Sequence, residues 1–140
     1  MSLRDKRCEF TALVAKLIEK INSTPGYEAA LNECGRSDEQ CVVNSIGEAG
    51  RAKVASLVEH VFPALALAIL NNGKANGILL SLHRDKLAVD IDLYKNGVYA
   101  PDTESHRQFG EWWEKQHLLA SWGGRFNDAN HYSLSDGGRK

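Results

Sequence analysis

Two histidines and one aspartate, His83, Asp90 and His131, are residue types that commonly hold a catalytic zinc ion. Three protein ligands leave the fourth position of a tetrahedral site open for water. Asp128 lies three residues before His131, so we expect a free carboxylate beside that water. The spacing differs from the His-Glu-x-x-His helix of many metalloproteases, in which both histidines lie one turn apart. The ligands are therefore expected on strands and a loop.

The residues around these candidate ligands have the pattern of β-strands. Residues 88–94 alternate apolar and polar side chains, and Lys95-Asn96-Gly97 follows them as a hairpin signal. Asp90 therefore projects from the face opposite to the apolar residues of that strand. The residues that begin with His131 alternate as well, so this side chain can reach the face of Asp90 if the strands pair. His83 would approach from the loop before the first strand.

The sequence resembles a family of zinc peptidases that includes D-Ala-D-Ala carboxypeptidases and phage L-alanyl-D-glutamate endopeptidases. The family signature reads Ser-x-His-x-x-Gly-x-Ala-x-Asp, followed by a Trp-Gly-rich turn and Asp/Glu-x-x-His. The residues that match this signature are Ser81, His83, Ala88, Asp90, Trp122, Gly123, Asp128 and His131. Lys86 stands where the family usually has Gly, and this departure lies between ligands rather than on one.

The resemblance implies a fold and a role for each site residue. The fold would be the α+β fold of DD-peptidases and hedgehog domains, with a small antiparallel sheet that carries the zinc site and is flanked by helices. The residues that hold Zn2+ would be His83, Asp90 and His131. Asp128 would act as general base, and Arg36, after the first strand, would stabilise the oxyanion. Ser81 and Trp122 would bind the substrate.

By resemblance, the reaction is hydrolysis of an amide bond in the stem peptide of peptidoglycan. Zinc would lower the pKa of its bound water from about 15.7 to about 7, while Asp128 takes the proton and returns it to the leaving amine. Our first expectation is a phage-type endolysin that cuts between L-Ala and D-Glu in host cell lysis. A D-Ala-D-Ala carboxypeptidase or dipeptidase is the alternative enzyme. A zinc-binding recognition module without turnover is the alternative from another class.

The metal-binding interpretation has its own alternatives. The set of His83, Asp90 and His131 could form a structural zinc site, or it could bind no metal. Asp128 favours the catalytic interpretation, because a structural site has no use for a carboxylate beside an open position. The other histidines, His60, His106 and His117, are interpreted as packed or solvated side chains.

Length and composition indicate a single domain. The 140 residues, of which 43% are hydrophobic, suffice for one globular domain and not for two. We expect residues 1–140 to form one zinc peptidase domain with a helical insertion at about 47–71, broken near Pro63. The net charge of −1 argues against nucleic acid as a partner. We expect a monomer whose partner is the peptidoglycan stem peptide.

Helices are also predicted before the candidate ligands in the sequence and between Asp90 and His131. Residues 3–22 place apolar side chains at spacings of three and four, and 101–119 form a second helix. Residues 27–32 are predicted as a short strand. A further helix begins near Ser37, which is its expected N-cap.

The sequence also predicts where the protein is made and acts. Residues 1–7 lack the apolar core and the cleavage site of a secretory signal. The longest apolar run, 61–70, is far shorter than the roughly 20 residues that span a bilayer, so we expect no stable membrane insertion. Three cysteines without Cys-x-x-Cys spacing fit synthesis under reducing conditions. We expect synthesis in the cytoplasm and action on the cell wall after another protein has permeabilised the membrane.

Overall fold

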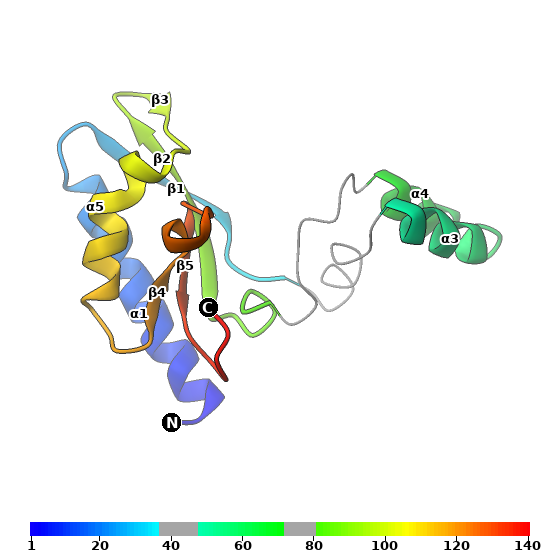
Figure 1. Cartoon of the computed structure of the whole chain (residues 1–140), viewed down its shortest axis with the longest axis horizontal. Helices are drawn as coiled ribbons and strands as arrows, with labels where there is room; N and C mark the ends of the chain where they lie inside the picture. Colours follow the sequence, from blue (N-terminus) through cyan, green and yellow to red (C-terminus); the bar gives the residue numbers. More distant parts are fainter. Residues whose placement is uncertain (37–47, 72–80) are drawn as a thin grey trace.

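The structure of the chain is a computed structural model, which describes residues 1–36, 48–71 and 81–140. It is an α+β structure in which a small antiparallel sheet is flanked by helices (Figure 1), as the family resemblance implies. The strand order is β1-β2-β5-β4, and the short strand β3 pairs with β2. The strands are β1 (Tyr27–Glu33), β2 (Ala88–Lys95), β3 (Val98–Tyr99), β4 (Ala120–Trp122) and β5 (His131–Leu134).

Helix α1 spans Leu3–Asn22, the range that its apolar spacing predicts. A capping box begins the helix, because the side chains of Ser2 and Asp5 each accept a hydrogen bond from the other residue's backbone N–H. The buried residues recur at spacings of three and four and form one face, which consists of Phe10, Leu13, Leu17 and Ile21. This face packs into the same apolar core as the sheet.

Helix α5 spans Thr103–Glu114 and lies on the same side of the sheet as α1 (Figure 1). The side chain of Asp102 caps it by accepting a hydrogen bond from the backbone N–H of Ser105 at 2.8 Å. The prediction of a helix over 101–119 is wrong at its C-terminal end. Strand β4 begins at Ala120 and pairs with β5, so the chain must leave the helix earlier.

The apolar core lies between the sheet and the helices α1 and α5. Alternate residues of β2 point into it, and Val89, Ile91 and Leu93 have no exposed surface. The largest side chains of the core are aromatic, and they are Phe10, Phe109, Trp113, Trp122 and Tyr132. Asp90 projects from the opposite face of β2. The sheet therefore separates the core from the face on which the candidate ligands lie.

A tight turn joins β2 to β3, as the sequence predicts. Asn96 and Gly97 have φ angles of 51° and 76°, and two positive φ angles are typical of a type I′ turn. The turn pairs Lys95 with Val98. It helps to set the register of β2, and a shift of one residue would move Asp90 to the core face.

In the sequence, two helices lie between strands β1 and β2. They are α3 (Glu48–Val58) and α4 (Pro63–Asn71). Pro63 begins α4, a position that proline favours because its missing N–H would have no partner there. The helices pack through Ala55 and Ala66. The expected break near Pro63 is confirmed, because one helix ends at Val58 and the next begins at Pro63. Ser37, the predicted helix cap, lies outside the described residues. Among the helices of the described ranges, none is both long and apolar enough to cross a membrane.

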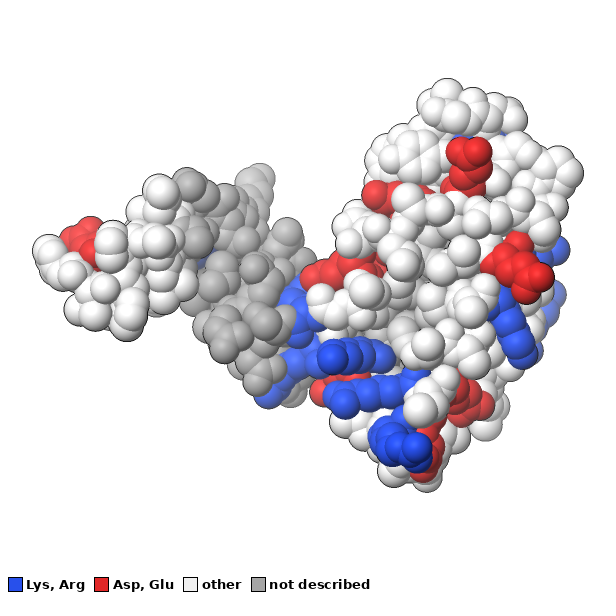
Figure 2. Space-filling model, turned by 180° about the vertical axis from the view of Figure 1, so that it is seen from behind, with Lys and Arg blue, Asp and Glu red and all other residues white. Residues whose placement is uncertain are grey.

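Basic and acidic side chains lie close together on the face shown in Figure 2. Lys6 forms an ion pair with Asp136, and Arg139 binds both Asp136 and Asp85 with N–O distances of 2.6 Å. Asp85 belongs to the loop before β2. This network therefore ties the loop that carries His83 to α1 and to the C-terminal residues.

Candidate metal centre

Strand pairing brings Asp90 and His131 together. They are direct partners in the register of the antiparallel strands β2 and β5, and directly opposed residues have neighbouring side chains on one face. Beside them, the backbone N–H of Ile91 donates to the carbonyl of Asn130 at 2.9 Å. Both predicted ligands thus lie on the sheet face opposite the core, as the alternation of the two strands indicates.

His83 approaches that face from the loop before β2. The N–H of Lys86 donates to the His83 carbonyl at 3.1 Å, which folds the loop into a turn. The hydroxyl oxygen of Ser81 accepts a hydrogen bond from the backbone N–H of His83 at 3.2 Å. Ser81 is buried, so its observed contact supports the His83 loop. Its expected contact with a substrate stays a prediction.

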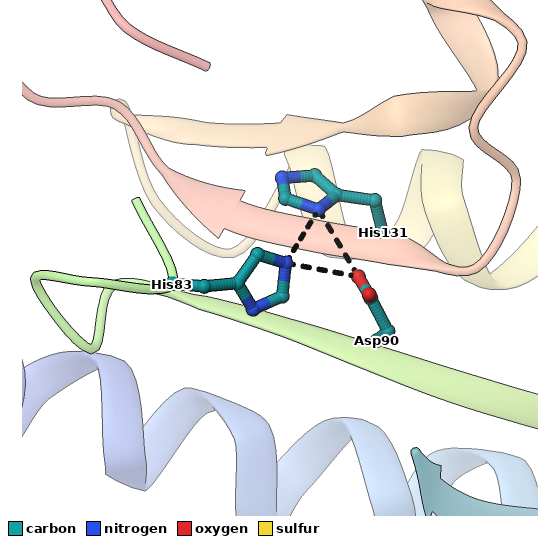
Figure 3. Close-up of side chains that lie close together, drawn as sticks. All are labelled: His83, Asp90 and His131. Carbon is teal, nitrogen blue, oxygen red and sulfur yellow. Dashed lines mark hydrogen bonds and ion pairs between the residues drawn. The ribbon is translucent and has the colours of Figure 1, made fainter. Parts of the chain in front are cut away.

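The three side chains point one atom each at a common centre (Figure 3). His83 Nε2 lies 3.2 Å from His131 Nδ1 and 3.2 Å from Asp90 Oδ1. His131 Nδ1 lies 3.1 Å from the same carboxylate oxygen. The atoms therefore form a nearly equilateral triangle, to which two strands and one loop contribute.

Hydrogen bonds alone cannot satisfy this triangle. A neutral imidazole has a single N–H. If both His83 Nε2 and His131 Nδ1 carried a proton, two hydrogen-bond donors would lie 3.2 Å apart. With one proton or none on these two nitrogens, at least one pair of atoms in the triangle would have lone pairs that face each other. A cation accepts all three lone pairs at once, and ligands of a tetrahedral zinc ion lie about 3.3–3.4 Å apart. His83, Asp90 and His131 could therefore hold a metal ion.

Asp90 is ionised in this arrangement. Burial by itself would raise its pKa, but hydrogen bonds and positive charge from His131 and His83 outweigh burial and hold the pKa of Asp90 well below its usual range. A carboxylate must be deprotonated to bind a metal ion. Asp90 is thus ready to act as a ligand across the neutral pH range.

Asp128 lies beside the triangle and outside it. Its Oδ2 is 3.9 Å from Nδ1 of His131, and 53% of its side chain is exposed. Partial burial raises the pKa of Asp128. The charge of His131 acts to lower this pKa, and the negative charge of Asp90 acts to raise it further. The structure brings this predicted residue to the site, where its carboxylate is placed to take up and return a proton.

Arg36 lies next to the site and is held by Glu33. Its Nε donates to Glu33 Oε1 at 2.9 Å, and its Nη2 donates to Glu33 Oε2. The backbone N–H of Arg36 donates to the carbonyl of His83 at 3.2 Å. Its positive charge also acts to lower the pKa of Asp128. The predicted arginine is therefore close to the proposed base, while two of its guanidinium nitrogens bind a carboxylate.

Glu33 is a site residue that sequence reasoning missed. It is paired in register with Asp90, at the end of β1. Its Oε2 lies 3.9 Å from the outer nitrogen of His83, Nδ1. The sequence offered one signal for Glu33. It lies three residues before Arg36, and both residues follow the first predicted strand, so a contact between their opposite charges could have been expected.

Trp122 does not lie on a surface that a substrate could reach. The side chain is fully buried, and its Nε1 donates to the carbonyl of Ala129 at 2.8 Å. A Cβ atom on either Gly110 or Gly124 would overlap the indole ring. The structure therefore does not favour the expected substrate-binding role. Trp122 instead supports the turn, helix η1 (Gly123–Phe126), that leads to Asp128.

The site combines three converging ligand atoms with one carboxylate beside them. Such a set suits metal-assisted hydrolysis, in which one carboxylate binds the ion and another moves a proton. Comparison with models of known protein families finds no match to this sequence, and comparison with curated proteins finds none. The geometry and the residue types therefore carry the assignment of a function.

Proposed function

We propose that this protein is a zinc-dependent peptidoglycan peptidase that hydrolyses a stem-peptide bond. The observation that carries the proposal is the position of Asp128, 3.9 Å from a nitrogen of the candidate ligand set and half exposed. A purely structural metal site needs no such carboxylate. The bond that we propose is the one between L-Ala and D-Glu, in a phage-type endolysin that acts in host cell lysis.

Zinc is the metal that the donor set supports best. Two imidazole nitrogens and one carboxylate oxygen match catalytic zinc sites, which use three protein ligands and keep one position open. The atoms all lie within 4.8 Å of one another. When bound, zinc supplies Lewis-acid chemistry, because it lowers the pKa of water and polarises a carbonyl group.

The backbone at Lys86 supports the resemblance to the zinc peptidase family. The family signature has Gly at this position, and glycine adopts positive φ angles without strain. Lys86 has a φ of 56°, which lies in the left-handed region. The loop therefore has the turn that a glycine would favour, although the residue differs. This agreement favours the same loop geometry between the two ligands His83 and Asp90.

The proposed reaction assigns a task to each residue beside the metal. Asp128 takes a proton from the attacking water and then passes it to the leaving nitrogen as the amide C–N bond breaks. Arg36 stabilises the negative charge that develops on the carbonyl oxygen. Ser81 keeps His83 in place through the backbone contact of 3.2 Å. Its contact with the stem peptide remains part of the proposal.

We further propose that the α+β structure belongs to the fold of DD-peptidases and hedgehog domains. Paired antiparallel strands that supply an aspartate and a histidine support this, together with a preceding loop that supplies the other histidine. Residues 1–140 would then form one domain, with α3 and α4 as an insertion. The protein would act as a monomer, made in the cytoplasm, on the cell wall after the membrane has been permeabilised.

The function is tested by incubating zinc-loaded protein with purified peptidoglycan and identifying the released ends by mass spectrometry. New N-terminal D-Glu is the expected product. Free D-Ala would instead identify the alternative carboxypeptidase or dipeptidase. Zinc binding and peptidoglycan binding without any new ends would identify a recognition module and contradict the proposed peptidase.

A further inference from the structure

The outer nitrogen of His83 is buried without a hydrogen bond. Among the described residues, His83 Nδ1 has no partner within hydrogen-bonding distance, although it is shielded from solvent. An unsatisfied buried polar atom costs on the order of 1–3 kcal/mol. Such an atom beside a candidate metal ligand indicates that its partner is supplied when the site is complete.

Metal binding decides which nitrogen of His83 carries the proton. Nε2 is the atom that faces Asp90 and His131, so it must offer its lone pair to the ion. The single proton of the neutral ring then lies on Nδ1. Metal-bound histidines usually donate this second N–H to a carboxylate, a carbonyl or water, which fixes the ring and makes it a stronger ligand.

Glu33 is placed to accept that proton. Its Oε2 lies 3.9 Å from His83 Nδ1, and a movement of about 1 Å would give a charge-assisted hydrogen bond of ordinary length. The register of β1 against β2 shifts between Leu31 and Glu33. Irregularities of this kind redirect side chains near functional sites.

Arg36 holds the Glu33 carboxylate in position. Its Nε and Nη2 bind the two carboxylate oxygens separately, which is the bidentate geometry that fixes orientation best. The backbone N–H of Arg36 also donates a hydrogen bond to the carbonyl of His83. Arg36 is therefore tied directly to the loop that carries His83, the other proposed partner of the Glu33 carboxylate. A line of contacts therefore runs from Arg36 through Glu33 to the outer nitrogen of His83.

We propose that Glu33 is a positioning residue for the metal centre, whose carboxylate accepts the Nδ1 proton of His83 when Nε2 binds zinc. Glu33 acts through His83 and does not touch the ion. This inference rests on the metal site of the proposed function, and it is independent of the substrate. If Glu33 served only as an ion-pair partner of Arg36, the affinity for zinc would not depend on its charge.

The test compares Glu33→Gln with Glu28→Gln, a matched change of an exposed glutamate on the same strand. Zinc affinity is measured by competition with a chromophoric chelator, and the visible spectrum of the cobalt-substituted protein reports the ligand field. We expect Glu33→Gln to weaken zinc binding about 10–100-fold and to shift the cobalt bands. Glu28→Gln should leave both unchanged.

A second measurement uses the wild-type protein and so does not depend on how the variant folds. Nitrogen–proton correlation spectra of the zinc-loaded protein should show a proton on Nδ1 of His83 that exchanges slowly with water. A proton on Nε2 instead, or fast exchange at Nδ1, would overturn the inference. Zinc affinity of a folded Glu33→Gln within about twofold of wild type would overturn it as well.

The outcomes separate this inference from the proposed function. Tight zinc binding that weakens in Glu33→Gln, together with no cleavage of peptidoglycan, would support the role of Glu33 and contradict the peptidase. Cleavage of peptidoglycan together with equal zinc affinity in wild type and Glu33→Gln would support the peptidase and contradict the role of Glu33. Failure of the wild-type protein to bind zinc would overturn both.

Discussion

Gly110 of α5 lies directly against the indole ring of Trp122, so a Cβ atom at position 110 would overlap the ring. The ring is fully buried and cannot move outward without opening the core. We expect Gly110→Ala to lower the free energy of unfolding by about 1–3 kcal/mol, the usual cost of overpacking. Urea unfolding followed by tryptophan fluorescence measures this change.

Gly35→Ala is the control for this experiment, because the nearest atom to an added Cβ there is Lys86 Cγ at 4.0 Å, an ordinary contact. It should unfold close to the wild-type midpoint. Equal midpoints for Gly110→Ala and Gly35→Ala would show that helix α5 adjusts to the extra methyl group.

The metal ligands give the second prediction. His83→Ala or His131→Ala should abolish zinc binding, because a site with two of its three protein ligands is open to solvent and loosely ordered. Peptidoglycan hydrolysis should be lost with the metal. Elemental analysis of purified, zinc-supplemented protein measures the first effect, and a wall-lysis assay measures the second.

His60→Ala is the matched control, since the His60 side chain is 88% exposed and lies in the turn between α3 and α4. It should keep one zinc ion per chain and full lysis. A His83→Ala protein that is folded and still holds one zinc ion would remove the proposed centre.

The third prediction separates catalysis from metal binding. Asp128→Asn keeps the size of the side chain but cannot accept a proton, so zinc should stay bound while turnover falls by about 10²–10⁴-fold. Thermal stability should change little, because the carboxylate is half exposed. Turnover is measured from released peptide ends, and zinc content is measured on the same sample.

Asp92→Asn is the control on the same sheet. Its carboxylate accepts hydrogen bonds from the Asn32 side chain at 3.1 and 3.2 Å, which indicates a structural role. We expect near-normal turnover. Normal cleavage by zinc-loaded Asp128→Asn would mean that another group is the base, and Asp85 and Asp92 would then be the next carboxylates to test.

The fourth prediction concerns pH and a buried histidine away from the metal. His106 has no exposed surface, and its Nδ1 lies 2.9 Å from the hydroxyl oxygen of Tyr132. Burial lowers the pKa of His106, although the charges of Asp102 and Asp92 oppose this. The unfolded chain therefore binds a proton more readily than the folded protein does.

The sign of the pH effect follows from this difference. Above the unfolded-state pKa of about 6.5, His106 is neutral in both states and has no effect. Below it the unfolded state takes up the proton first, so stability falls as pH decreases, by at most about 1.4 kcal/mol per pH unit. Urea unfolding at pH 7.5 and 5.5 should show a smaller loss for His106→Gln than for wild type. An equal loss in both proteins would assign the pH dependence to other groups.

Much of the fold was predictable because its signals are local. The apolar spacing of α1, the Asn96-Gly97 turn and the alternation of β2 each act within a few residues, and each specified its element correctly. The candidate ligands were predictable for a related reason. His83, Asp90 and His131 have metal-binding side chains, and strand alternation already indicated a shared face.

Contacts between distant segments decided the rest. Pairing of β4 with β5 ended α5 early, and no pattern within that helix indicates the pairing. Trp122 is buried against Gly110 of the distant helix α5, which leaves room for its ring, as does Gly124 two residues further along the chain. Glu33 and Asp90 are far apart in the chain, and only the register of β1 against β2 brings that carboxylate to the site. The sequence by itself determined which residues could bind a metal ion, whereas the tertiary structure decided what surrounds and supports them, because those neighbours are set by packing.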